Sequence, residues 1–280
     1  MNRQHRGYRR QPLPRTRRLM ISLGHATRHK HTIYGLVEID VTRPRRLMEE
    51  HKARTGEAPS FTAFLAACVG QSVAQHPEMQ SYRTWRNQQV LFDDVDIQIQ
   101  VERHLHGQTL PVPHIVRAAN HKTVWDIQEE IRAVQAAPTH GQAVKGVRWL
   151  TALPSFARQF CFWFLLKQPH LIKRFIGTVG VTAIGMFADR GGWGMGLPSP
   201  HTFGILAGGI ASRPVLVNGN VEAHEMLCVT LHFDHDLIDG APATRFAQHL
   251  IEMIEAGYGL SEEATAMTEQ QSASETSRQR

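Results

Sequence analysis

A histidine and an aspartate stand four residues apart where a strand is expected to end and a helix to begin. The apolar stretch 226–233 predicts a strand, and His235 follows it almost at once. Asp239 and Gly240 come next, and the sequence from about Ala241 has the apolar spacing of an amphipathic helix. A histidine at such a junction can reach a substrate as a general base, and a nearby carboxylate can fix the local geometry. The pattern therefore predicts acid–base chemistry at His235.

The segment around this histidine, LHFDHDLIDGAPATRF, resembles the active-site motif of the dihydrolipoamide acyltransferases of 2-oxo acid dehydrogenase complexes and of chloramphenicol acetyltransferase. Residues 31–103, the stretch LPVPHIVRAANHKTVWDIQEEI and the stretch GVTAIGMF resemble further parts of the same catalytic domain, in the same order. Together they cover most of residues 16–256. The resemblance implies an α/β (α+β) fold, the chloramphenicol acetyltransferase-like fold of coenzyme A-dependent acyltransferases, with a mixed sheet and packed helices.

The resemblance also implies catalytic roles. His235 matches the family's general base, whose alternative is an ordinary structural histidine at a strand end. Thr182 matches the hydroxyl that stabilises the oxyanion, where many relatives have serine, although a β-branched residue also suits a strand. Asp236 stands where relatives commonly carry arginine, a change expected to alter coenzyme or acceptor preference.

Supporting residues follow from the same match. Asp239 corresponds to a residue that holds the shape of the site, and its family partner is an arginine near the start of the domain. Arg18 fits that position best and Arg17 less well, and either could be a surface charge. Gly240 is expected to let the chain turn tightly into the helix. No cysteine or carboxylate spacing predicts a metal site.

The implied activity is transfer of an acyl group from a coenzyme A thioester, or from a carrier thioester, to a thiol, hydroxyl or amine. No lipoyl-lysine region is found, so a separate lipoyl or acyl carrier protein is a candidate partner. The family's active site lies between subunits, which predicts a homotrimer. A non-catalytic scaffold of the same fold and a peripheral membrane-associated protein are the alternatives.

The composition fits one catalytic domain, at 280 residues and 42% hydrophobic content. Cys68, Cys161 and Cys228 are isolated, as expected for reduced thiols in the cytoplasm. Seven arginines within residues 3–18 supply more positive charge than the net +6 of the chain, and nucleic-acid binding is not expected for this segment. We expect a disordered basic arm at 1–15, the catalytic domain at 16–258 and a disordered polar tail at 259–280.

Residues 146–176 are expected to be an apolar insertion in that domain. Packing on the core or at a subunit interface is the favoured role for it. The alternative is that this segment forms a wall of the acyl-binding site for a long acyl chain. Membrane contact is not favoured.

Local signals predict several elements. Thr42 and Ser60 are expected to cap helices, and Thr123 with Asp126 resembles a capping box. Alternation of apolar and polar residues over 95–101 predicts a half-buried strand.

Overall fold

The computed structural model describes residues 11–105, 108–137, 150, 153–183, 191–196 and 198–261. Most of the predicted basic arm and polar tail lies outside these ranges.

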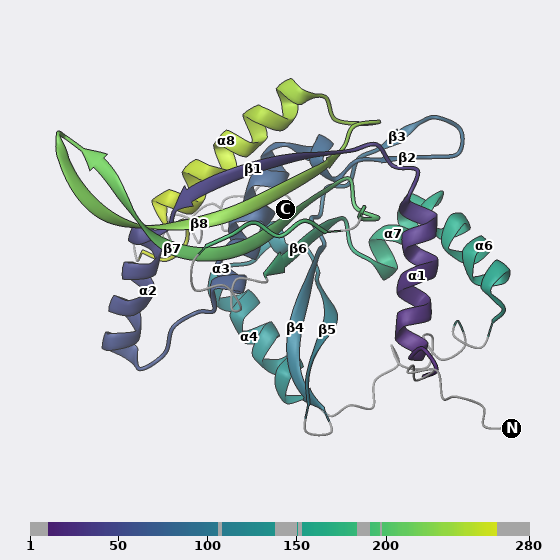
Figure 1. The fold of residues 1–280 in the computed structure, drawn as a ribbon, viewed down its shortest axis with the longest axis horizontal. Coiled ribbons are helices and arrows are strands. Elements are labelled where there is room, and N and C mark those ends of the chain that lie inside the picture. The colour runs from purple at the N-terminus through teal and green to yellow at the C-terminus, as the bar shows by residue number, and fades with distance from the viewer. Residues whose placement is uncertain are drawn as a thin grey trace, which may run out of the picture.

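The centre of the molecule is a mixed six-stranded sheet with the order β1-β8-β7-β6-β4-β5 (Figure 1). β6 pairs in parallel with both of its neighbours, and the other pairings are antiparallel. The strands are β1 (Thr32–Asp40), β4 (Ile97–Leu105), β5 (Gln108–Val116), β6 (Val179–Ala183), β7 (Phe203–Val217) and β8 (Asn220–Asp234). A separate two-stranded ribbon joins β2 (Tyr82–Arg83) to β3 (Gln89–Val90).

Helices cover one face of this sheet and also form a separate pair beside it. The α-helices are α1 (Arg15–Thr27), α2 (Thr42–Thr55), α3 (Phe61–Gln75), α4 (Val124–Ala136), α6 (Ser155–Leu166), α7 (Pro169–Phe175) and α8 (Gly240–Ala256). Short 3₁₀ turns are at Pro77–Gln80 and Ala119–His121. α3 and α8 pack on the sheet, whereas α1 packs against α6 at one side of the molecule (Figure 1).

The core lies between the sheet and the helices α3 and α8. Phe64, Phe203 and Phe246 are fully buried there, and the rings of Phe203 and Phe246 meet edge to face at 4.6 Å. A buried aromatic side chain contributes roughly 1.5–3 kcal/mol to folding relative to an exposed one. Burial of this cluster fixes how α8 lies on the sheet, and thereby fixes the junction between β8 and α8.

The predicted caps of two helices are confirmed. Ser60 Oγ accepts a hydrogen bond from the Ala63 amide at 3.2 Å, and Thr123 with Asp126 forms a complete capping box. The third prediction is wrong, because Thr42 lies inside α2. The Asp40 carboxylate accepts hydrogen bonds from the Thr42 amide at 2.9 Å and the Thr42 hydroxyl at 2.6 Å. A carboxylate two residues earlier therefore serves the first turn of α2.

β7 and β8 form a long hairpin that projects beyond the helices (Figure 1). Asn218 and Gly219 connect the strands with positive φ angles of 50° and 85°. An Asn-Gly pair suits this turn because two positive φ angles match the twist of the flanking strands. The tip exposes Leu216 and Val221.

Candidate active site

His235 directly follows the last residue of β8. Its side chain is exposed and has no hydrogen bond or ion pair with another residue in the described part of the chain. Its backbone amide donates to the His31 carbonyl at 2.7 Å. The backbone at His235 is therefore fixed to the start of β1, while the imidazole is free to meet a substrate.

The residue before His235 belongs to an ion pair with a buried carboxylate and a half-buried lysine. Lys30 Nζ lies 2.9 Å from Asp234 Oδ2, and it also donates to the carbonyls of Pro200 at 2.9 Å and His201 at 3.1 Å. Burial lowers the pKa of Lys30, and the attraction of Asp234 opposes that shift. The Asp234 carbonyl accepts from the amides of Leu237 and Ile238. Lys30 thus holds the turn that carries His235.

The residue after His235 also has a partner on the same segment. Asp236 Oδ1 lies 2.8 Å from His31 Nδ1, on the surface. The hydrogen bond to Asp236 raises the pKa of His31. Asp236 therefore has a basic partner in His31. Lys30 and His31 thus contact Asp234, His235 and Asp236 one after another. These contacts fix the turn on both sides of His235.

Two further histidines lie on the sheet face opposite α3 and α8. The His232 ring covers Gly204, where an added Cβ would come within 2.3 Å of it, and the His201 ring covers Gly180 at 2.8 Å. Burial lowers the pKa of His232 to about 4 and the pKa of His201 to about 3. Both rings are therefore neutral near neutral pH. His232 Nε2 is buried and has no hydrogen-bond partner.

Thr182 lies on the short strand β6, and its hydroxyl has no hydrogen bond to another described residue. Its neighbours across the sheet are Leu206 on β7 and Thr230 on β8. Asp234 is four residues further along β8, or about 13 Å, and β8 is two strands away, or about 10 Å. The backbone positions of Thr182 and the His235 turn are therefore about 16 Å apart in one chain. A base must lie within about 3 Å of the proton that it takes, and an oxyanion donor within about 3 Å of the carbonyl oxygen. Two groups whose backbones are about 16 Å apart therefore do not serve the same reacting carbonyl within one chain.

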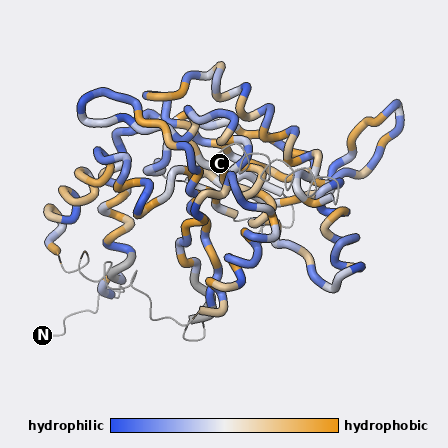
Figure 2. The backbone as a smooth tube through the Cα atoms, turned by 180° about the vertical axis from the view of Figure 1, so that it is seen from behind, coloured by the Kyte–Doolittle hydropathy of each residue, from blue (hydrophilic) through white to orange (hydrophobic). Residues whose placement is uncertain are grey.

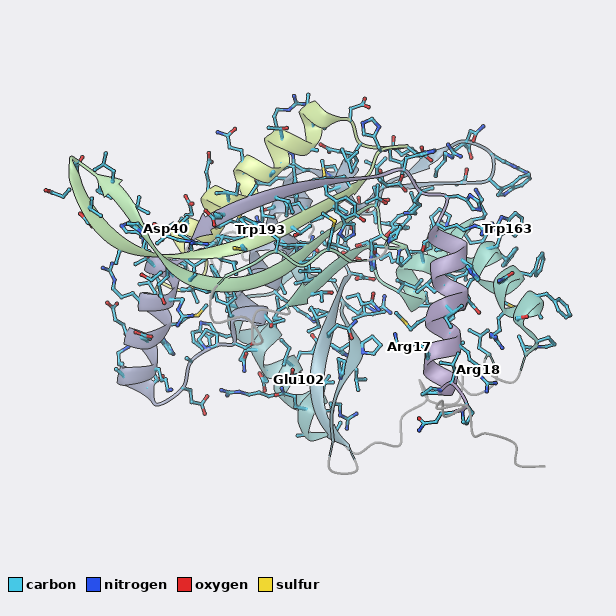
Figure 3. All side chains as sticks on the ribbon, viewed as in Figure 1. Arg17, Arg18, Asp40, Glu102, Trp163 and Trp193 are labelled. Atoms are coloured by element: carbon cyan, nitrogen blue, oxygen red, sulfur yellow. The ribbon has the colours of Figure 1, made fainter. Side chains whose placement is uncertain are left out.

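The supporting residues lie apart from one another. Asp239 precedes α8 with an exposed side chain that forms no capping hydrogen bond. Arg18 is exposed in the first turn of α1, and Figure 3 shows it with Arg17 at the end of that helix far from β1. Nine residues of helix separate Arg18 from Thr27, or about 14 Å. The expected pairing of Arg18 with Asp239 is absent from the described contacts.

Gly240 is the first residue of α8, and its φ angle is not positive. An added Cβ there would meet nothing within 4 Å. The turn into α8 therefore does not need glycine for its backbone, contrary to the expected role.

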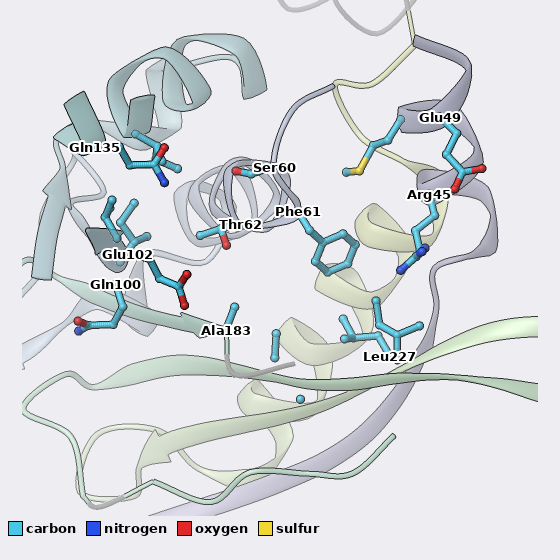
Figure 4. Close-up of a pocket in the computed structure, with 17 residues that line it drawn as sticks. Arg45, Glu49, Ser60, Phe61, Thr62, Gln100, Glu102, Gln135, Ala183 and Leu227 are labelled. Atoms are coloured by element: carbon cyan, nitrogen blue, oxygen red, sulfur yellow. The ribbon is translucent and has the colours of Figure 1, made fainter. Parts of the chain in front are cut away.

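A cavity of about 590 Å³ lies on the other face of the sheet (Figure 4). Phe61, Ala183 and Leu227 are among its lining residues. Side chains alternate along a strand, so Ala183 and Thr182 point to opposite faces of β6. The cavity is therefore separated by the sheet from the Thr182 hydroxyl. Within the described ranges, no group of three or more histidine, cysteine or acidic side chains could hold a metal ion.

The buried residues of this site were missed by sequence reasoning. Lys30 reads as one of several basic residues before β1, and its burial depends on a partner 204 positions away. His232 had a usable signal. Thr230, His232 and Asp234 alternate with apolar residues at the end of β8, which places all three on one face of the sheet.

Comparison with known proteins decides the family. The model for the 2-oxoacid dehydrogenases acyltransferase (catalytic domain) matches residues 5–144 and 176–260, which is more than half of the sequence. The chain belongs to this acyltransferase family. The match omits residues 145–175, which correspond to the predicted insertion and include α6 and α7.

Curated proteins with similar sequences are acyltransferase components of 2-oxo acid dehydrogenase complexes. The dihydrolipoyllysine-residue acetyltransferase component of the pyruvate dehydrogenase complex from Mycoplasma pneumoniae is 28% identical over 197 residues, 70% of this chain and 41% of that protein. The mitochondrial dihydrolipoyllysine-residue succinyltransferase component of the 2-oxoglutarate dehydrogenase complex from Saccharomyces cerevisiae is 34% identical over 79 residues, 28% of this chain and 17% of that protein. The chain thus spans less than half the length of these curated relatives.

Solved structures show the fold. A probable dihydrolipoamide acetyltransferase from Listeria monocytogenes 4b F2365 superposes with a TM-score of 0.67 at 19% identity, covering 90% of this chain and 96% of that one. The dihydrolipoamide acetyltransferase of Azotobacter vinelandii gives a TM-score of 0.63 at 17% identity, covering 89% and 93%. The predicted mixed sheet with packed helices is confirmed.

Proposed function

We propose that this acyltransferase-family chain transfers an acyl group from a coenzyme A or carrier thioester to an acceptor thiol, hydroxyl or amine. His235 is the general base, and Thr182 donates a hydrogen bond to the oxyanion. The observation that carries the proposal is the exposed, unpartnered imidazole of His235 on a backbone gripped by residues 30 and 31. A rigid backbone with a free side chain suits a base that must meet an incoming substrate.

The chemistry needs only these groups. His235 takes the proton of the acceptor, whose sulfur, oxygen or nitrogen forms a bond to the thioester carbonyl carbon. The carbonyl oxygen becomes an oxyanion and accepts a hydrogen bond from the Thr182 hydroxyl. The bond from carbon to the coenzyme A sulfur then breaks, and the imidazolium returns its proton to the departing thiolate.

The pattern of the proposed groups has a parallel in a structural neighbour. The Azotobacter vinelandii structure was described with the roles of a serine, a histidine and an asparagine in its catalytic mechanism, and the last two are four residues apart. His235 and Asp239 have the same spacing, and Thr182 precedes His235 by nearly the same interval as that serine precedes its histidine. The names of the sequence relatives favour the thiol of a dihydrolipoyllysine residue as acceptor.

The separation of about 16 Å between Thr182 and the His235 turn supports a site shared between two copies. We propose a homotrimer in which the histidine of one subunit faces the hydroxyl of its neighbour. Cyclic symmetry then forms three equal sites from one kind of contact.

The first experiment measures thiol release from short to long acyl-coenzyme A donors, with dihydrolipoamide, amine and alcohol acceptors. Acceptor-dependent release that falls at least about 100-fold in His235→Ala supports the base. His121→Ala, which removes a histidine whose side chain is 58% exposed, is the matched control and should keep full activity. Equal release from wild type and His235→Ala would exclude His235 as the base.

A mixing experiment tests the shared site. Co-expression of His235→Ala and Thr182→Val chains in equal amounts should leave roughly one quarter of the sites intact in randomly mixed trimers. A site within one chain would leave none. Activity of the mixture no higher than that of the single variants would therefore contradict a shared site.

A further inference from the structure

An aromatic stripe runs along the exposed face of α6. Phe156, Phe160, Trp163 and Phe164 are 74%, 64%, 53% and 47% exposed. At 100° per residue they fall within an arc of about 100°, and Lys167 falls in the same arc just past the helix end. The rings of Phe160 and Trp163 stack at 5.9 Å. Four large aromatic side chains at helical spacing thus form one continuous patch, which we call the α6 stripe.

The α6 stripe is not the side by which the helix packs on the protein. Arg158, on the opposite side, is buried and donates hydrogen bonds to Ser22 Oγ on α1 at 3.3 Å and to the Leu153 carbonyl at 2.5 Å. Figure 2 shows α6 as a largely hydrophobic coil at the margin of the molecule, and Figure 3 places Trp163 at that margin. A contiguous exposed apolar patch of this kind marks an interaction site.

The elements around the α6 stripe carry charge of one sign. α1, α6 and α7 contain no aspartate or glutamate, and Arg17, Arg18 and Arg174 are exposed on α1 and α7, while Lys173 of α7 lies 3.8 Å from Asp94. Two identical surfaces of this kind would repel when placed face to face. An anionic partner, by contrast, would be attracted to the basic side chains of these helices.

A groove between α1 and α6 adds a site for an anion. It has a volume of about 270 Å³, and Arg28 and Trp163 are among its lining residues. Arg28 Nε donates to His29 Nε2 at 3.1 Å, and the two terminal nitrogens of Arg28 have no hydrogen bond to a described residue. A guanidinium with two free nitrogens suits a phosphate oxygen pair.

We propose that α1 and α6 form a peripheral binding surface for a membrane of anionic phospholipid. The α6 stripe enters the boundary between headgroups and acyl chains, Lys167 stays at headgroup level, and Arg28 binds a lipid phosphate. No helix in the described residues is long and apolar enough to span a bilayer, so the contact is with the membrane surface. This surface lies outside the proposed catalytic chemistry and is independent of it.

Sedimentation of the full chain with vesicles tests the proposal. Wild type should bind phosphatidylcholine vesicles containing phosphatidylglycerol, and added salt should weaken binding. Phe160→Ser with Trp163→Ser should reduce the partition coefficient by about tenfold or more. Arg28→Gln should weaken binding to anionic vesicles and leave binding to pure phosphatidylcholine unchanged.

The matched control is Trp85→Ser, because Trp85 is 64% exposed beside Arg86, in the loop between β2 and β3. This variant should bind like wild type. Equal loss in Trp85→Ser, or no binding of wild type to anionic vesicles, would overturn the proposal. Light scattering on the Phe160→Ser, Trp163→Ser protein gives a second readout. A loss of oligomer mass without any wild-type vesicle binding would assign the α6 stripe to a subunit contact instead.

Discussion

Acid should destabilise this protein through the low pKa values of His232, which is partly buried, and His201, which is buried. His232 and His201 have folded-state pKa values of about 4 and about 3, against 6.5 for an unperturbed histidine. Between those values the unfolded chain binds more protons than the folded one. The free energy of unfolding therefore falls as pH drops below about 6.5. The perturbation that isolates one of these groups is His232→Gln, which keeps a polar side chain and cannot titrate.

The size of the effect follows from the pKa differences. At about pH 5 an unfolded histidine is almost fully protonated, whereas His232, with a pKa of about 4, is mostly neutral. Between about pH 7.5 and pH 5, His232 lowers the free energy of unfolding by about 2 kcal/mol. His201 lowers it by about 2 kcal/mol more. His232→Gln should therefore lose about 2 kcal/mol less than wild type over this interval.

The assay is urea unfolding followed by tryptophan fluorescence at both pH values, with protomer concentration fixed because association changes apparent stability. The relevant quantity is the pH-dependent loss within each protein, so any constant cost of the substitution cancels. His121→Gln, at a 58% exposed side chain, is the control and should lose as much as wild type. The reasoning is refuted if wild type and His232→Gln lose the same free energy.

Three further predictions concern other residues of the site. Lys30→Met should lower the free energy of unfolding by about 3–5 kcal/mol, because it leaves the buried Asp234 carboxylate unpaired, and adding Asp234→Leu should restore part of it in a double-mutant cycle. Gly204→Ala should lower the free energy of unfolding by at least about 1 kcal/mol, because the added Cβ would clash with the His232 ring. Gly24→Ala in α1 is the comparison, because nothing lies within 4 Å of its added Cβ, and it should raise the free energy of unfolding by about 0.5–1 kcal/mol. Urea unfolding measures both changes. Thr182→Val should lower kcat by about 100-fold at unchanged fold, and Thr182→Ser should retain activity; equal kcat in Val and Ser variants would remove the hydroxyl from the mechanism.

Local rules determine much of this chain. The caps at Ser60 and Thr123 depend on side chains within three residues of the amides they serve, so their positions can be found from the sequence. The alternation along β4 is similarly a property of one strand. Thr42 is the exception, because Asp40, two residues before it, provides the acceptor at the start of α2.

The candidate site also has features that are local in sequence and features that depend on distant residues. His235 and Asp239 lie within one short segment at a strand-to-helix junction, so the sequence alone predicts them as a candidate site and identifies the acyltransferase family. Its setting is not local. The Lys30–Asp234 pair joins positions 204 residues apart, and the burial of His232 depends on a glycine of β7. Only the register of β6, β7 and β8 shows that Thr182 and the His235 turn are about 16 Å apart, since sheet order is set by packing across the whole chain. The sequence thus determined which groups can do chemistry, and the tertiary structure decided which of them are buried, paired or out of reach within one subunit.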